Sequence, residues 1–226
     1  MSTIARLART RPSALLLTVQ LAGILLYPWM EDDGAGRALF SVFGLAVLAL
    51  VLLTIRKSAT LTWLSILLGV PAAILLVMQA VTGSDDLLPW SSGLEAVLYL
   101  YAAWALIRYM LADHEITRDE LFAVGATFTL VAWGFAYIYV VCQAIEPGSF
   151  TAAVDPGAQR TWMELLYLSF TTLTSTGLSD IVPVEPFARS LVMLEQVAGL
   201  AYVAMVVSRL VGLLVQRRAD GDGPPT

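Results

Sequence analysis

Cysteine and histidine are almost absent from this chain of 226 residues, which contains one of each. A single cysteine excludes an intrachain disulfide, and the two residues together are too few for a cysteine–histidine metal cluster. Cys142 lies in an apolar stretch, where we interpret it as a small packing residue. His114 lies in a polar linker without a partner, a position typical of a surface residue rather than a ligand or a catalytic base.

Charged side chains are also scarce, at 14% of the sequence, whereas 58% of the residues are hydrophobic. A soluble domain of this length does not need so much apolar surface, so the composition indicates a polytopic membrane protein. Basic residues occur only as short flanks of the apolar segments, so nucleic acid is not an expected partner. The apolar segments also lack the paired aspartates or serine–histidine pair of an intramembrane enzyme, so we expect no enzymatic activity.

A membrane-spanning helix needs about 20 predominantly apolar residues. Six such segments occur, at 13–29, 38–55, 61–81, 94–112, 121–145 and 186–215. The first has the basic start of a secretory signal but no small-residue cleavage site, so we expect it to be retained. The segment at 162–180 is too short and too polar at its end to cross, and we expect it to enter the membrane and return.

Basic residues are concentrated on one side of these predicted spans. They precede the first span, lie in the second-to-third and fourth-to-fifth links, and follow the last span. By the positive-inside rule, both termini are cytoplasmic. We therefore expect a multi-pass protein of the plasma (inner) membrane, in contact with lipid. The opposite side is acidic, which either concentrates cations there or reflects only that acidic residues escape the rule.

The fourth span lacks the repeated arginines of a voltage sensor, which gains about 2.3 kcal/mol per charge per 100 mV over several charges. It contains Arg108 alone, near its cytoplasmic end, where we interpret the charge as reaching the interface. We expect little voltage dependence. In the link that follows, Thr117 and Glu120 have the spacing of a capping box, which would start the fifth helix.

The segment at 167–180 reads YLSFTTLTSTGLSD, an amphipathic run followed by a hydroxyl-rich loop with one glycine. Non-helical backbone is tolerated at membrane depth only where it is buried or lines a water-filled path. The string is followed by Asp180-Ile181-Val182-Pro183 and by a glycine-bearing last span. In order and spacing, these features resemble the bacterial two-transmembrane pore-domain family of potassium channels.

The resemblance implies an all-α membrane protein with six transmembrane helices, a re-entrant pore helix and a filter loop. It divides the chain into a four-helix N-terminal region (1–114), a pore domain (115–216) and a short cytoplasmic tail (217–226). One chain supplies one loop, so a ring of carbonyls requires four chains, and we expect a homotetramer.

The expected function is an ion channel for monovalent cations, with K+ as the permeant ion and no organic cofactor. A non-selective or weakly conducting relative stays open as an alternative. So does a membrane interaction subunit with a vestigial pore.

The family filter reads T-V-G-Y-G, and the matching residues here are Ser175, Thr176, Gly177, Leu178 and Ser179, with Asp180 at the outer mouth. The resemblance implies that K+ is bound by the Ser175 hydroxyl and by the carbonyls of Ser175, Thr176, Gly177 and Leu178.

The outer half of this filter departs from the family pattern. Gly177 is retained and can adopt the positive φ that lets successive carbonyls point the same way. Ser179 replaces a glycine; left-handed backbone at a non-glycine residue costs about 1–2 kcal/mol, so we expect the outer end of the loop to relax. Leu178 replaces an aromatic residue and cannot make its hydrogen bond. A single glycine per loop also resembles Trk/Ktr-type potassium transporters, so selectivity for K+ over Na+ stays open.

Residues around the loop are expected to support or gate it. Thr171 and Thr174 lie on the predicted pore helix as support residues. Glu195 of the last span either bonds behind the filter or contacts ions directly. Gly199 matches the family's gating hinge, and close helix packing is the alternative.

Overall fold

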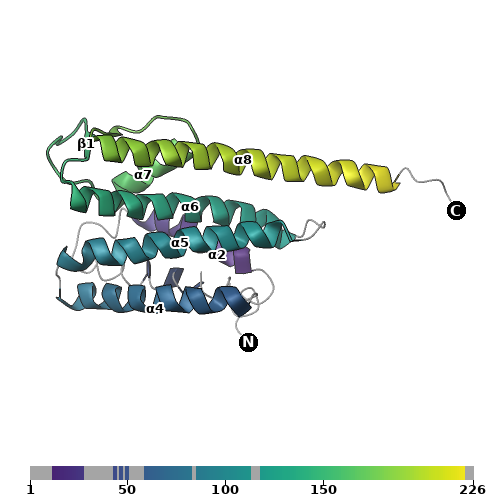
Figure 1. The fold of residues 1–226 in the computed structure, drawn as a ribbon, viewed down its shortest axis with the longest axis horizontal. Coiled ribbons are helices and arrows are strands. Elements are labelled where there is room, and N and C mark those ends of the chain that lie inside the picture. The colour runs from purple at the N-terminus through teal and green to yellow at the C-terminus, as the bar shows by residue number, and fades with distance from the viewer. Residues whose placement is uncertain are drawn as a thin grey trace.

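The computed structural model describes residues 12–27, 43–44, 46–47, 49–50, 59–82, 85–112 and 118–221. Helices dominate these ranges (Figure 1). In chain order the elements are α2 (Pro12–Leu26), α4 (Ala59–Thr82), the 3-10 turn η2 (Asp85–Leu87), α5 (Leu88–Met110), α6 (Arg118–Ile145), β1 (Phe150–Ala152), α7 (Trp162–Leu173), β2 (Ile181–Pro183) and α8 (Pro186–Gly221). Most of the span expected at 38–55 lies outside the described residues, and so does Thr117.

Within the ranges that the structure describes, two helices are by themselves long and apolar enough to cross a membrane, at 119–145 in α6 and 186–212 in α8. Shorter apolar helices occupy 12–26 and 66–79. α5 begins at Leu88 rather than near 94, because Pro89 fits the first turn of a helix, where its missing N–H is not needed. α8 continues through 217–221, into the segment expected to be the tail.

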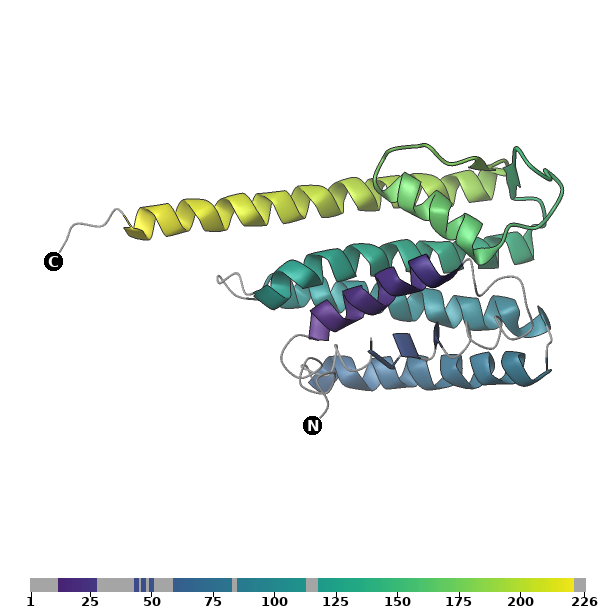
Figure 2. The same ribbon diagram turned by 180° about the vertical axis from the view of Figure 1, so that it is seen from behind.

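α6 separates the two halves of the molecule (Figures 1 and 2). On one side it packs against α7 and α8, and on the other against α5 and α2, with α4 outside α5. The N-terminal helices therefore pack on the α6 helix of their own chain. At about 1.5 Å per residue, the 36 residues of α8 extend for roughly 54 Å, and its C-terminal part projects beyond the other helices in Figure 1.

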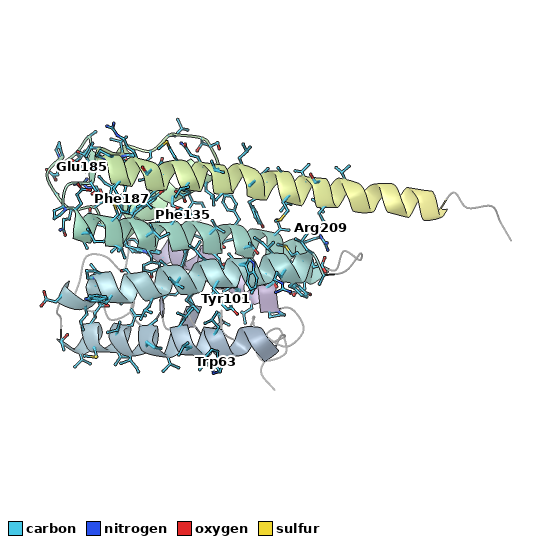
Figure 3. The ribbon with its side chains drawn as sticks, in the orientation of Figure 1. Trp63, Tyr101, Phe135, Glu185, Phe187 and Arg209 are labelled. Carbon is cyan, nitrogen blue, oxygen red and sulfur yellow. The ribbon has the colours of Figure 1, made fainter. Side chains whose placement is uncertain are left out.

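Hydrogen bonds and one ion pair fix the relative directions of these helices. Asp119, in the first turn of α6, accepts from the backbone N–H and the hydroxyl of Ser13 at 3.3 and 3.1 Å. Arg209 of α8 pairs with Glu120 of α6 at 3.1 Å (Figure 3). The starts of α2 and α6 and the C-terminal half of α8 therefore lie at the same end of the molecule.

An aromatic cluster of Tyr99, Trp133, Tyr137 and Trp162 connects the N-terminal helices to α7. Tyr99 of α5 stacks on Tyr137 of α6 at 5.6 Å between ring centroids, and its edge meets Trp133 at 5.8 Å. Trp133 and Tyr137 both contact Trp162, the first residue of α7, at 5.2 and 5.6 Å. Such pairs contribute about 0.5–1.5 kcal/mol each beyond area burial, so α7 is tied to α5 through α6.

Candidate functional site

α7 begins at a complete capping box. The Thr161 hydroxyl accepts from the Glu164 backbone N–H at 3.3 Å, and the Glu164 carboxylate accepts from the Thr161 backbone N–H at 2.6 Å. The Gln143 side chain of α6 bonds both backbone groups of Arg160, at 2.7 and 3.0 Å. These bonds satisfy the helix start and attach it to the end of α6.

The segments on either side of α7 are also held in place. The buried Arg160 guanidinium donates to carbonyls of the preceding segment, Val154, Asp155 and Ala158, and forms an ion pair with Glu164 at 3.2 Å. β1, before α7, pairs antiparallel with β2, which follows the loop. The two ends of the hairpin-like segment from 150 to 183 are therefore joined to each other.

The middle of α7 is held by a carboxylate clamp, which we define as Tyr139, Ser169 and Glu195. Glu195 of α8 is fully buried, and its carboxylate accepts hydrogen bonds from the hydroxyls of Tyr139 in α6 and Ser169 in α7. The Ser169 hydroxyl also lies 2.8 Å from the Ala132 carbonyl oxygen. This position agrees with the interpretation of Glu195 as a residue that bonds behind the filter.

The C-terminal end of α7 rests directly on α8 at Gly199. A methyl group on Gly199 would lie 2.2 Å from the Leu173 carbonyl oxygen and 3.0 Å from its Cα, so only glycine fits there. α8 is a continuous helix through this residue. This close contact is what the packing alternative for Gly199 requires, and its role as a hinge stays a prediction.

The amides of the loop turn back toward α7. Ser175 donates to the Thr172 carbonyl at 3.0 Å, while Thr176 and Gly177 both donate to the Thr171 carbonyl, at 3.0 and 3.2 Å. In a planar trans peptide the carbonyl points opposite to the N–H. The carbonyls of Ser175 and Thr176 therefore both point away from α7.

Two residues with left-handed backbone produce this arrangement. Gly177 has φ of 65°, as expected from its place in the motif, and Ser175 has φ of 59°. Ser179 is not among the positive-φ residues of the described chain. The non-glycine residue with strained backbone is therefore Ser175, at the inner end of the loop, and Ser179 at the outer end is free of this strain.

Thr171 and Thr174 support the loop in different ways. The Thr171 hydroxyl bonds its own helix at the Leu168 carbonyl, so its contribution to the loop comes from its backbone carbonyl. Thr174 bonds the Phe170 carbonyl at 2.7 Å, and its hydroxyl lies 3.0 Å from that of Thr176.

Leu178 differs from its expected position. Its carbonyl accepts a hydrogen bond from the Tyr167 hydroxyl of α7 at 3.2 Å, rather than pointing away from α7 with those of Ser175 and Thr176. Sequence reasoning did not identify Tyr167 as a site residue. The available signal was helical spacing, because Tyr167 and Thr171, four residues apart, share one face of α7.

Two hollows adjoin the loop. One is lined by Tyr167 and Asp180 together with Glu164, and Asp180 is exposed, in keeping with an outer mouth. The other is lined by Ser175, Gly177 and residues of α7 and α8, including Gln196. Within the described ranges no group of three or more His, Cys, Asp or Glu could hold a metal ion.

Two long apolar helices that flank a short helix and a hydroxyl-rich loop define a pore-loop membrane protein. A family model described as "Ion channel" matches residues 125–216. Two curated relatives, both called Protein LctB, come from Geobacillus stearothermophilus and Bacillus caldotenax and are 32% and 29% identical over 103 residues. The match covers 44% of this chain and 76% of each relative. The chain therefore belongs to the ion channel family. No solved structure matches it.

Proposed function

We propose that four copies of this chain assemble around one axis and that their loops form a path for monovalent cations, with K+ preferred. The observation that carries this proposal is the shared acceptor at Thr171. Because Thr176 and Gly177 both donate to it, two successive carbonyls point away from α7. In a fourfold ring such carbonyls replace the hydration shell of a cation.

Further features of the chain favour cations in this path. The C-terminal end of α7 carries partial negative charge and lies beside the inner hollow. The Ser175 hydroxyl would supply the innermost ligands, and the exposed Asp180 would add negative charge at the outer mouth. An organic cofactor has no role in this scheme.

The proposed membrane arrangement has six spanning helices and both termini in the cytoplasm. This arrangement is supported by the structure's geometry, because the starts of α2 and α6 and the C-terminal half of α8 lie at the same end of the molecule. Applied to the sequence, the positive-inside rule assigns that end to the cytoplasmic surface of the membrane.

A non-selective cation channel is the second candidate. It is favoured by one observation, the hydrogen bond that holds the Leu178 carbonyl against Tyr167. Fewer carbonyl rings leave a cation more hydrated, which weakens discrimination between K+ and Na+.

The test is a recording of the purified protein in planar bilayers with K+ on one side and Na+ on the other, with its mass measured from mild detergent. We expect a tetramer and a reversal potential displaced toward that of K+. A reversal potential near zero would support the second candidate. A tetramer without current would support a vestigial-pore interaction subunit, and a monomer would contradict a pore.

A further inference from the structure

The side chain at position 178 is a leucine and has no hydroxyl, but a hydroxyl on α7 bonds the backbone of this residue. Tyr167 of α7 donates to the Leu178 carbonyl at 3.2 Å. The donor lies on a helix and the acceptor on the loop backbone, so the bond fixes the direction of one peptide group. The side chain of Leu178 is 77% exposed and provides no comparable restraint.

The position of Tyr167 is determined by a helix that is anchored along its whole length. The capping box at Thr161 holds its start, the carboxylate clamp holds Ser169, and Leu173 rests on Gly199. A tyrosine side chain has only two rotatable bonds before its rigid ring. The hydroxyl is therefore presented to the loop from a fixed base, on the side of the hollow that also contains Asp180.

The loop carbonyls consequently divide into two groups. Those of Ser175 and Thr176 point away from α7, whereas that of Leu178 is turned toward Tyr167 on α7. Because the Leu178 carbonyl accepts a hydrogen bond from α7, it points to the opposite side from the carbonyls of Ser175 and Thr176. Loss of the Tyr167 hydroxyl would release the Leu178 carbonyl without altering the loop itself.

We propose that Tyr167 is a positioning residue that sets ion selectivity, because it withholds the Leu178 carbonyl from the cation path. This inference rests on the proposed function of the loop. In four copies, release of Leu178 would add a ring of carbonyl dipoles to the path. More coordinating carbonyls replace more of the hydration shell, which favours K+ over the more strongly hydrated Na+.

The experiment compares wild type, Tyr167→Phe and the matched control Tyr202→Phe. The control also loses a hydroxyl that donates to a backbone carbonyl, that of Val124 at 2.6 Å, but this bond joins α8 to α6 away from the loop. Reversal potentials between K+ and Na+ solutions give the permeability ratio. We expect a several-fold higher K+/Na+ ratio for Tyr167→Phe and the wild-type ratio for Tyr202→Phe. An unchanged or lower ratio for Tyr167→Phe overturns the proposal.

A second measurement does not depend on current. The thermal stability of the purified tetramer is followed as K+ or Na+ is titrated, because an ion that binds the folded assembly stabilises it. Tyr167→Phe should lower the K+ concentration needed for half-maximal protection and leave that for Na+ unchanged. If wild type carries no current, the proposed function fails, and this titration decides the role of Tyr167 by itself. Equal K+ titrations for wild type and Tyr167→Phe overturn that role.

Discussion

Ser175 and Gly177 give the loop its two left-handed residues, but their side chains make the cost unequal. Glycine adopts positive φ freely, whereas serine pays about 1–2 kcal/mol for it. The strain at Ser175 is offset by hydrogen bonds, because the N–H groups of the loop donate to the Thr171 and Thr172 carbonyls. The inner half of the loop is thus held by backbone bonds, to which the Thr176 hydroxyl adds a bond to the Thr171 carbonyl at 3.3 Å.

Gly177→Ala should abolish or strongly reduce cation current without preventing assembly. Alanine at φ of 65° costs about 1–2 kcal/mol per chain, and relief of that strain turns the Thr176–Gly177 peptide out of line. Bilayer currents and the mass of the complex are the measurements. Gly157→Ala is the control, because a methyl group there meets nothing within 4 Å and φ is not positive. Wild-type currents from a Gly177→Ala tetramer would contradict the role of this backbone conformation.

Gly199→Ala should destabilise the protein, because the added methyl group would lie only 2.2 Å from the Leu173 carbonyl oxygen, closer than the two atoms can approach. Overpacking of this kind costs about 1–3 kcal/mol. The measurement is the temperature of thermal unfolding in detergent. Gly212→Ala is a matched control on the same helix, since a methyl group there has no neighbour within 4 Å. Equal unfolding temperatures for the two variants, with altered gating only in Gly199→Ala, would instead support the hinge.

At the scale of elements, the part of α8 before Gly199 and the part after it make different contacts with the neighbouring helices. Toward its start, the buried Glu195 joins it to α6 and α7. Toward its end, the Tyr202 hydroxyl donates to the Val124 carbonyl of α6 at 2.6 Å, and Arg209 pairs with Glu120 of α6. The part of α8 that follows Gly199 is thus tied to α6, and these bonds resist any movement of α8 away from α6.

Arg209→Gln should raise the open fraction of the pore if opening separates α8 from α6. The Arg209–Glu120 pair is largely buried, with side-chain exposures of 17% and 4%. A hydrogen bond to a charged group contributes about 1.5–3 kcal/mol, and about 1.4 kcal/mol changes an equilibrium tenfold. Single-channel open probability is the measurement.

Arg189→Gln is the control for this prediction. Arg189 lies on the same helix and bonds the Pro183 carbonyl from an exposed position, away from α6. The charge swap Glu120→Arg with Arg209→Glu should restore the wild-type open fraction. An Arg209→Gln open fraction equal to that of Arg189→Gln would show that the ion pair has no part in gating.

At the scale of the whole molecule, α6 packs against two groups of helices. Its contacts with α7 and α8 position the loop, and its contacts with α5 and α2 attach the N-terminal helices. Trp162 lies where these two sets meet, because it starts α7 and packs against Trp133 and Tyr137 of α6. Movements of the N-terminal helices can therefore reach the first residue of α7 through α6.

Conductance should depend only weakly on voltage. Arg108 is the basic residue of α5, and its guanidinium lies 5.0 Å above the Trp104 ring near the helix end. A single charge near the membrane surface crosses little of the field, whereas about 2.3 kcal/mol per charge per 100 mV must accumulate over several charges. The conductance–voltage relation of the reconstituted protein is the measurement. A relation as steep as that of voltage-gated channels would contradict this expectation.

The sequence by itself determined the class of protein, the order of the elements and the position of the loop. Apolar length marks a spanning helix, and the hydroxyl-rich string with Gly177 marks the loop; both signals are local. The family match at 125–216 agrees with the pore domain inferred from those strings. Helix ends were less certain, since Pro89 moved the start of α5 and α8 continued into the expected tail.

Only the tertiary structure decided which residues meet. Only the folded chain shows that Gly199 packs against Leu173, and its role as a hinge stays a prediction. Glu120 has the spacing of a cap with Thr117, which lies outside the described residues, and its carboxylate also pairs with Arg209, 89 residues away in the chain. Tyr167 joined the site because α7 carries its hydroxyl to the Leu178 carbonyl. Local patterns specify elements because helix formation depends on near neighbours, whereas such contacts arise only when distant segments pack together.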